Sequence, residues 1–168
     1  MTVTEKRDII ITDPCYFVKD KDWGLDTGFD FDKMKINLPD FSDYIWINTG
    51  FGDGSGTVFQ SEKVLSQYEL EEVIIKLRQE EELPNFSELG KFGVDSGTFG
   101  AFFYDEVLKY NPDFALDVGS WCYTIIPDFR GAIYNTSLDD SDESTTDDNY
   151  YCYNYIIGSG NKSICTIW

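Results

Sequence analysis

Two short segments of the sequence each place an aspartate before Ser or Thr and a glycine. The first is Asp26-Thr27-Gly28, and the second is Asp95-Ser96-Gly97, which lies inside the apolar run 91–103. Two carboxylates that share one proton can activate a water molecule, because one acts as a general base while the other polarises the carbonyl group under attack. The two segments therefore raise the hypothesis of a hydrolase that uses Asp95, with Asp26 or the Asp95 of a second subunit as its partner.

Residues 94–98, Val-Asp-Ser-Gly-Thr, resemble the active-site signature of the aspartic proteases, and Ile156-Ile157-Gly158 resembles the segment that pairs with the active-site loop in retroviral-type members. The sequence before Asp26 lacks the strand that such a loop needs. Asp-Ser-Gly is also a common turn sequence, because Asp and Ser bond nearby backbone amides and Gly accepts a positive φ. We therefore favour a structural role in turns for Asp13, Asp95, Ser96 and Gly97, and expect the Asp95 carboxylate to cap the amides that follow it.

The sequence contains no histidine, which excludes Ser-His-Asp and Cys-His catalysis and histidine-ligated zinc. Its four cysteines form no C-x-x-C motif, so we expect buried, reduced thiols and neither a zinc ribbon nor a thioredoxin site. The glycine-rich stretch 50–56 has Asp53 as its single carboxylate, too few for a calcium loop, and lacks the Lys of a phosphate loop. We expect neither a metal nor a cofactor, and favour a non-enzymatic function.

The chain carries 31 acidic and 13 basic residues, a net charge of −18. Direct binding to nucleic acid is disfavoured, because Lys and Arg side chains drive that binding. A basic protein surface, such as that of a nucleic-acid enzyme, is the partner that this charge favours. Acidic surfaces also serve solubility alone.

Residues 136–149 contain six carboxylates and no basic residue, which predicts a mobile acidic loop. In the next segment, 150–155, the tyrosines Tyr151, Tyr153 and Tyr155 occupy every second position and so share one side of a strand. Tyrosine is favoured at protein interfaces. The predicted contact residues are Asp139, Asp140, Asp142, Glu143, Asp147, Asp148, Tyr151, Tyr153 and Tyr155. These residues favour an acidic binding protein of the inhibitor, immunity or phage counter-defence type.

A third hypothesis is a protein that sequesters a small molecule, with nucleotides among the candidates. Its pocket would be lined by aromatic side chains such as Trp23, Trp46 and Trp121. Bases can stack on such rings, but a nucleotide would have to overcome the unfavourable net charge.

Short β-branched and aromatic runs predict strands at 8–12 and 44–49, and the glycines of 50–56 predict a hairpin or wide turn leading to a strand at 57–59. Residues 92–95 and 99–103 are typical of a buried strand pair around the Asp-Ser-Gly. Apolar residues at three-to-four spacing predict a long helix from about Ser61, a good N-cap, to about Glu82. A shorter helix is expected over 104–110.

The remaining chain reads as strands at 121–126, 130–135, 150–157 and 163–168. A single domain over residues 1–168 follows, of the α+β class, with a β-rich antiparallel sheet or sandwich and one main α-helix. The N-terminus lacks a signal-peptide pattern and no apolar run reaches 18 residues, so we expect a cytoplasmic protein that is not membrane-bound.

Residues 12–16, Thr-Asp-Pro-Cys-Tyr, followed by Trp23, and residues 92–100 resemble uncharacterised small proteins of bacteria and their phages. Those proteins share an early Asp-Pro-Cys-Tyr, a central Val-Asp-Ser-Gly and often a late Gly-Asp-Gly. Here Gly52-Asp53-Gly54 comes early, and the late counterpart is Gly158-Ser159-Gly160. The resemblance implies a bacterial host cytoplasm, no established activity, and an architectural role for Asp13 and Asp95.

Overall fold

The structure is a computed structural model that describes residues 2–19, 40–48, 54–61, 66–78, 86–114, 122–136, 153–157 and 162–167. Its strands are β1 Thr2–Thr12, β2 Tyr44–Asn48, β3 Gly54–Ser61, β4 Phe86–Val94, β5 Thr98–Phe103, β6 Tyr123–Thr136, β7 Tyr153–Ile157 and β8 Lys162–Ile167. The helices are η1 Pro14–Tyr16, α1 Gln67–Arg78 and α2 Tyr104–Tyr110. The predicted β-rich α+β class is confirmed.

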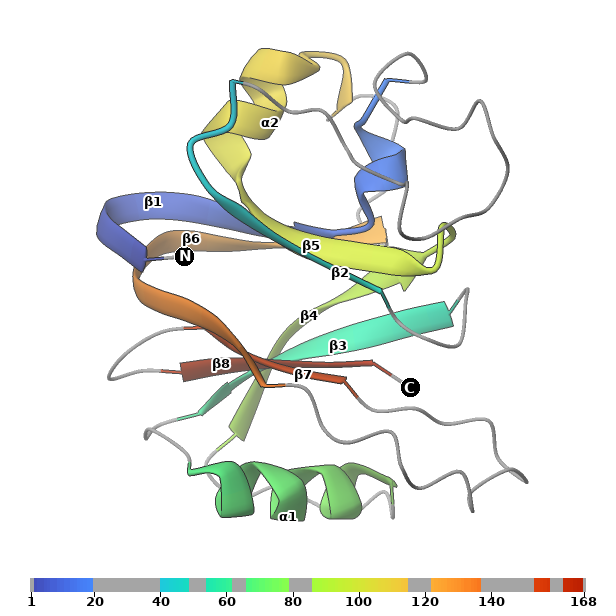
Figure 1. Ribbon diagram of the computed structural model, residues 1–168, viewed down its shortest axis with the longest axis vertical. Helices are drawn as coiled ribbons and strands as arrows, with labels where there is room; N and C mark the ends of the chain where they lie inside the picture. The colour runs from blue at the N-terminus through green and yellow to red at the C-terminus, as the bar shows by residue number, and fades with distance from the viewer. Residues whose placement is uncertain are drawn as a thin grey trace.

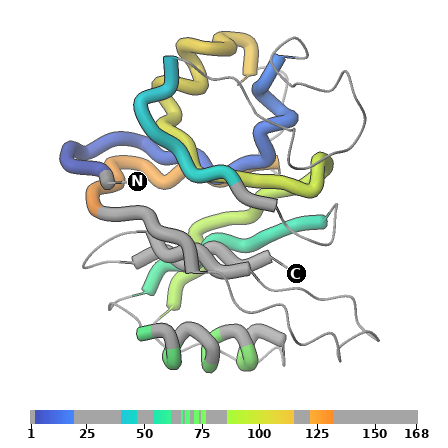
Figure 2. The backbone as a smooth tube through the Cα atoms, viewed as in Figure 1, coloured from blue at the N-terminus to red at the C-terminus, as the bar shows by residue number. Residues whose placement is uncertain are grey.

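The strands pair antiparallel in the order β2-β5-β1-β6-β7-β8-β3-β4. The long β6 belongs to two sheets. Its residues 123–132 pair with β1 in the first sheet, which is formed by β2, β5, β1 and β6, and its residues 133–136 pair with β7 in the second sheet, which continues through β7, β8, β3 and β4. Figure 1 shows the resulting layers, with α2 above the first sheet, the second sheet below it and α1 on the far side of the second sheet. In Figure 2 the blue segment of β1 runs beside the orange segment of β6.

Both faces of the first sheet are buried, which explains the uninterrupted Ile9-Ile10-Ile11 in β1. Ile9 and Ile11 belong to the core cluster that also contains Phe92 of β4 and Phe99 of β5. Ile10 faces the opposite way and packs in a second cluster with residues of η1 and α2. The second cluster is strongly aromatic, and its buried rings are Phe17, Phe41, Phe102 and Phe114.

The hairpin alternative for 50–56 is wrong, and so is the predicted strand pair around the Asp-Ser-Gly. β2 and β3 do not form a hairpin, since β2 pairs with β5 in the first sheet whereas β3 pairs with β4 and β8 in the second. Likewise β4 and β5 are not partners of each other, so residues 95–97 carry the chain from one sheet to the other. The periodicity of the side chains located the strands but contained no information about their partners.

The predicted long helix is confirmed as α1, with narrower bounds. Ser61 is not its N-cap but the last residue of β3. A capping box begins the helix instead, since the Ser66 hydroxyl accepts the N–H of Glu69 at 3.2 Å and the Glu69 carboxylate accepts the N–H of Ser66 at 3.2 Å. The second predicted helix is confirmed as α2.

The strands expected at 121–126 and 130–135 are parts of one irregular strand, β6. The irregularity lies at Asp128, whose φ is 50°, and Gly131, whose φ is 146°. The register with β1 shifts at the same place, which is typical of a bulge. The N–H of Asp128 is held by the Asp8 carboxylate at 3.0 Å. Within the described ranges, no helix has the length and apolar character needed to cross a membrane.

Candidate functional site

A buried carboxylate connects two segments that lie more than 80 residues apart in the chain. Each oxygen of Asp13 accepts two hydrogen bonds. Oδ1 accepts from the N–H of Cys15 at 2.8 Å and the hydroxyl of Ser96 at 2.7 Å. Oδ2 accepts from the N–H groups of Asp95 and Ser96 at 2.8 and 2.7 Å. We call Asp13, Tyr16, Asp95, Ser96 and Cys122 the turn junction.

Local sequence explains how Asp13 reaches this position. Asp13 is the N-cap of η1 and Pro14 follows it with a preset φ, so the chain turns sharply where β1 ends. On the other side Gly97, with φ of 74°, allows the turn after Ser96 that a residue with a Cβ would resist. The Ser96 hydroxyl also contacts that of Thr98 at 2.8 Å, which extends the buried polar chain into β5.

The surroundings of Asp13 suit an organising group rather than a reacting one. Its side chain is fully buried, and burial raises the pKa of its carboxyl, while the hydrogen bonds from Ser96, Cys15 and Asp95 oppose that rise. Four intramolecular donors occupy both oxygens, so neither oxygen is left to bind a substrate or take a proton from water.

Asp95, by contrast, presents an exposed carboxylate, which accepts a hydrogen bond from the hydroxyl of Tyr16. Burial and this carboxylate raise the pKa of Tyr16, so its phenol keeps its proton and remains a donor. Tyr16 also contacts Cys122, whose pKa is raised by burial and by Asp95 and lowered in part by the phenol. Cys122 is a buried free thiol, as expected, whereas Cys15 is only half-buried.

The sequence predicted that the Asp95 carboxylate caps the amides that follow it, and the structure differs from this prediction. The amide of Ser96 is held by Asp13, and the carboxylate of Asp95 faces Tyr16. The participation of Tyr16 and Cys122 was not predicted. The sequence did contain a signal for Tyr16, since Cys15 and Tyr16 belong to the Asp-Pro-Cys-Tyr motif.

The strand register places the ends of strands from both sheets around the turn junction. The Cα partners there are Thr12 with Gly100, Asn48 with Thr98, and Gly54 with Val94. The Asp-Pro-Cys-Tyr motif, the Val-Asp-Ser-Gly motif and the last glycine of Gly-Asp-Gly, far apart in the sequence, therefore meet at one end of the fold. Among the described residues, no group of three or more Cys, Asp or Glu side chains is arranged to hold a metal ion.

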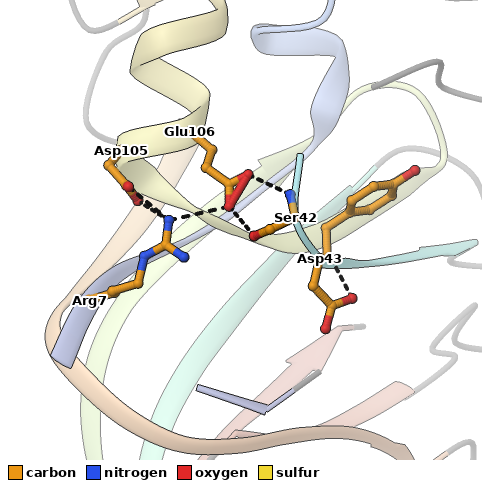
Figure 3. Close-up of polar contacts among 6 residues, drawn as sticks. Arg7, Ser42, Asp43, Asp105 and Glu106 are labelled. Atoms are coloured by element: carbon orange, nitrogen blue, oxygen red, sulfur yellow. Dashed lines mark hydrogen bonds and ion pairs between the residues drawn. The ribbon is translucent and has the colours of Figure 1, made fainter. Parts of the chain in front are cut away.

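A second polar cluster fixes the chain where it enters β2 (Figure 3). Arg7 of β1 pairs with Asp105 at 2.7 Å and Glu106 at 3.2 Å, both in the first turn of α2. The Glu106 carboxylate also accepts the N–H of Ser42 at 2.8 Å and the Ser42 hydroxyl. The guanidinium of Arg7 lies 3.6 Å from the ring centroid of Phe103, so β1, β5, α2 and the approach to β2 are held together.

Several predicted site residues lie outside the described residues, namely Asp26, Asp139, Asp140, Asp142, Glu143, Asp147, Asp148 and Tyr151. For Tyr153 and Tyr155 the backbone is described, as part of β7, but the side chains are not. Of the aromatic residues proposed to line a pocket, Trp46 is described and packs half-buried against the second core cluster. Trp23 and Trp121 lie outside.

In the comparisons with known proteins, no family model matches the chain, and neither does a curated protein or a solved structure.

Proposed function

We propose that this chain is a non-enzymatic acidic binding protein of the inhibitor type, which occupies a basic surface of a partner protein. The net charge of −18 favours such a partner, because opposite charges accelerate association and discriminate against acidic surfaces. The six carboxylates of the 136–149 loop are the main proposed contacts, with Tyr151, Tyr153 and Tyr155 as aromatic anchors.

The observation that carries the proposal is the exposed carboxylate of Asp95 on a rigidly held turn. Asp13 fixes the backbone of the turn through the amides of Asp95 and Ser96, and the Tyr16 hydroxyl orients the carboxylate. A preorganised charge loses less side-chain freedom when it meets a Lys or Arg of the partner, so more of the interaction energy contributes to affinity.

The same geometry supports binding over hydrolysis. A carboxylate dyad needs two close groups that share a proton. Asp13, the carboxylate whose hydrogen bonds tie it to the Asp95 turn, has both oxygens occupied by protein donors. The partnership of Asp95 with Asp26, or with a second subunit, stays a prediction.

A pull-down from bacterial lysate at low and high salt tests the proposal. The bait is the full chain, compared with a variant in which Asp139, Asp140, Asp142 and Glu143 are changed to Asn or Gln. A control variant carries the same changes at four exposed carboxylates elsewhere, Glu5, Glu72, Glu88 and Asp113, and so has the same net charge. We expect one basic protein to be retained at low salt, released at high salt, lost with the loop variant and kept by the control.

Equal loss with both variants would mean that net charge alone retains the protein, which contradicts a specific site. Failure to retain any basic protein would reject the proposed function. A third variant, Asp95→Asn, is expected to weaken retention by several-fold without affecting the fold, because the Asp95 carboxylate is exposed and its backbone amide remains.

A further inference from the structure

We infer that the outer edge of β2 is the place where an extended, basic segment of the partner adds as a further strand. This inference rests on the proposed function and gives it a docking mode. β2 stands at one end of the strand order, and β5 is the strand that pairs with it among the described residues. An edge strand presents unpaired backbone groups in a row, to which an extended peptide can bind.

The contacts of β2 show which backbone groups point outward. Gly100 of β5 is the Cα partner of Trp46. A Cβ added at Gly100 would lie 2.1 Å from the carbonyl oxygen of Ile45. The Ile45 carbonyl therefore faces β5. In an antiparallel strand the N–H and C=O of alternate residues point to opposite edges. The groups of Tyr44, Trp46 and Asn48 therefore point to the outer edge. The N–H of Tyr44 is consistent with this direction, because it donates to the Asp43 carboxylate at 2.9 Å and not to β5.

β2 is held firmly enough to act as a template. Ile45 packs against the core cluster between the sheets, while Tyr44 and Trp46 pack against the aromatic cluster on the other face. Tyr44 stacks on Phe102, with ring centroids 5.6 Å apart. Figure 3 shows that Glu106 holds Ser42 just before the strand begins. The backbone of β2 is therefore already ordered, so binding of a further strand does not have to pay the entropy cost of ordering it.

The charges around β2 select a basic occupant. An exposed aspartate lies near each end of β2. Asp40 comes four residues before the first residue of the strand. Asp95 comes three residues before Thr98, which is the Cα partner of Asn48 at the other end of the strand. The strand itself, Tyr-Ile-Trp-Ile-Asn, carries no charge. A segment with an apolar or β-branched middle and Lys or Arg at both ends complements this pattern, and five strand residues span about 16 Å at roughly 3.3 Å each. A second copy is disfavoured, because each chain carries −18.

The experiment uses the ¹⁵N-labelled full chain and the peptide acetyl-KTVTVK-amide as the probe. Titration is expected to shift the amide signals of Trp46 and Asn48, and to shift them less as salt increases. A matched peptide with Glu at both ends is expected not to bind. In the KTVTVK peptide the N–H groups of the central valine and threonine point to opposite edges, so N-methylation of both removes one donor that faces β2 in either register. It is expected to weaken binding about two- to tenfold.

A matched pair of variants tests the backbone directly. Asn48→Pro removes both the Asn side chain and the outward backbone N–H of residue 48. Asn48→Ala also removes the side chain but keeps this N–H. We expect Asn48→Pro to bind the peptide about two- to tenfold more weakly than Asn48→Ala, the range that one hydrogen bond supports. Unchanged circular dichroism and thermal unfolding establish that Asn48→Pro is folded, and the N-methylated peptide provides the same test on the unaltered protein.

Shifts outside β2, or equal binding of the Glu-ended peptide, would overturn the inference. Concentration-dependent shifts of the same amides without peptide would also overturn it, by assigning the edge to self-association. A lysate partner that is lost with the loop variant but retained equally by Asn48→Pro and Asn48→Ala would reject docking at β2 and leave the proposed function standing. If no basic partner is recovered, the proposed function fails whatever the peptide does.

Discussion

The carboxylate of Asp13 and the amide of Ser96 are joined at 2.7 Å across 83 residues of sequence. This bond fixes the end of β1 to the turn that carries the chain between the two sheets. Three further hydrogen bonds to the same carboxylate make Asp13 the centre of the turn junction.

The first prediction concerns the stability that Asp13 provides. Asp13→Ala is expected to lower the free energy of unfolding by about 3 kcal/mol or more, because it leaves several buried donors without an acceptor. Asp113→Ala, at an exposed carboxylate, is the control and should change it by about 0.5 kcal/mol or less. Urea unfolding at neutral pH measures both. Equal effects of the two variants would contradict the organising role of Asp13.

The second prediction concerns the alkaline limit of stability. The pKa of Tyr16 is raised in the folded chain by burial and by Asp95. The contribution of its protonated phenol is therefore fully present below the unfolded value of about 10, and is lost as the pH rises beyond it. The difference in unfolding free energy between the unaltered chain and Tyr16→Phe should shrink between pH 9 and 11. A difference that grows with pH would show the opposite sign of the shift.

The third prediction concerns the reactivity of Cys122. Its thiol is buried and its pKa is raised, and only the thiolate is a good nucleophile. In a variant with Cys15, Cys152 and Cys165 changed to Ser, iodoacetamide at pH 8 should modify Cys122 at least about tenfold more slowly than free cysteine. The same variant in denaturant provides the reference. Equal rates in the folded and denatured chain would contradict the buried position.

The fourth prediction concerns the contact between β2 and β5. An added Cβ at Gly100 would lie 2.1 Å from the Ile45 carbonyl oxygen and 2.8 Å from the ring of Phe102. Neither neighbour can yield easily, because one is backbone and the other is fully buried. Gly100→Ala should therefore lower the free energy of unfolding by about 1–3 kcal/mol. Ser87→Ala, at an exposed position of β4, serves as the control and should have little effect.

The positions of most strands and of both longer helices can be predicted from the amino-acid sequence. The uninterrupted Ile9–Ile11 and the aromatic run at 99–103 need burial on both sides. Helical spacing identified α1, and the stop signal at Pro112 marked the end of α2. These are local properties, which is why they can be read without knowing the partners. The helix start was misplaced, because Ser61 and Ser66 are both good caps and only the β3 pairing takes Ser61 into a strand.

The sequence also indicated that Asp13 and Asp95 organise turns, but not which backbone or side-chain groups each carboxylate binds. Either carboxylate can bond a nearby amide, and only tertiary structure brings Asp13 onto the amides of Asp95 and Ser96 and leaves the Asp95 carboxylate to Tyr16. Strand partners were decided in the same way. Alternation within a strand fixes which side chains are buried but not which strand lies beside it, so the separation of β2 from β3 and the outer edge of β2 emerge only from the packed sheets.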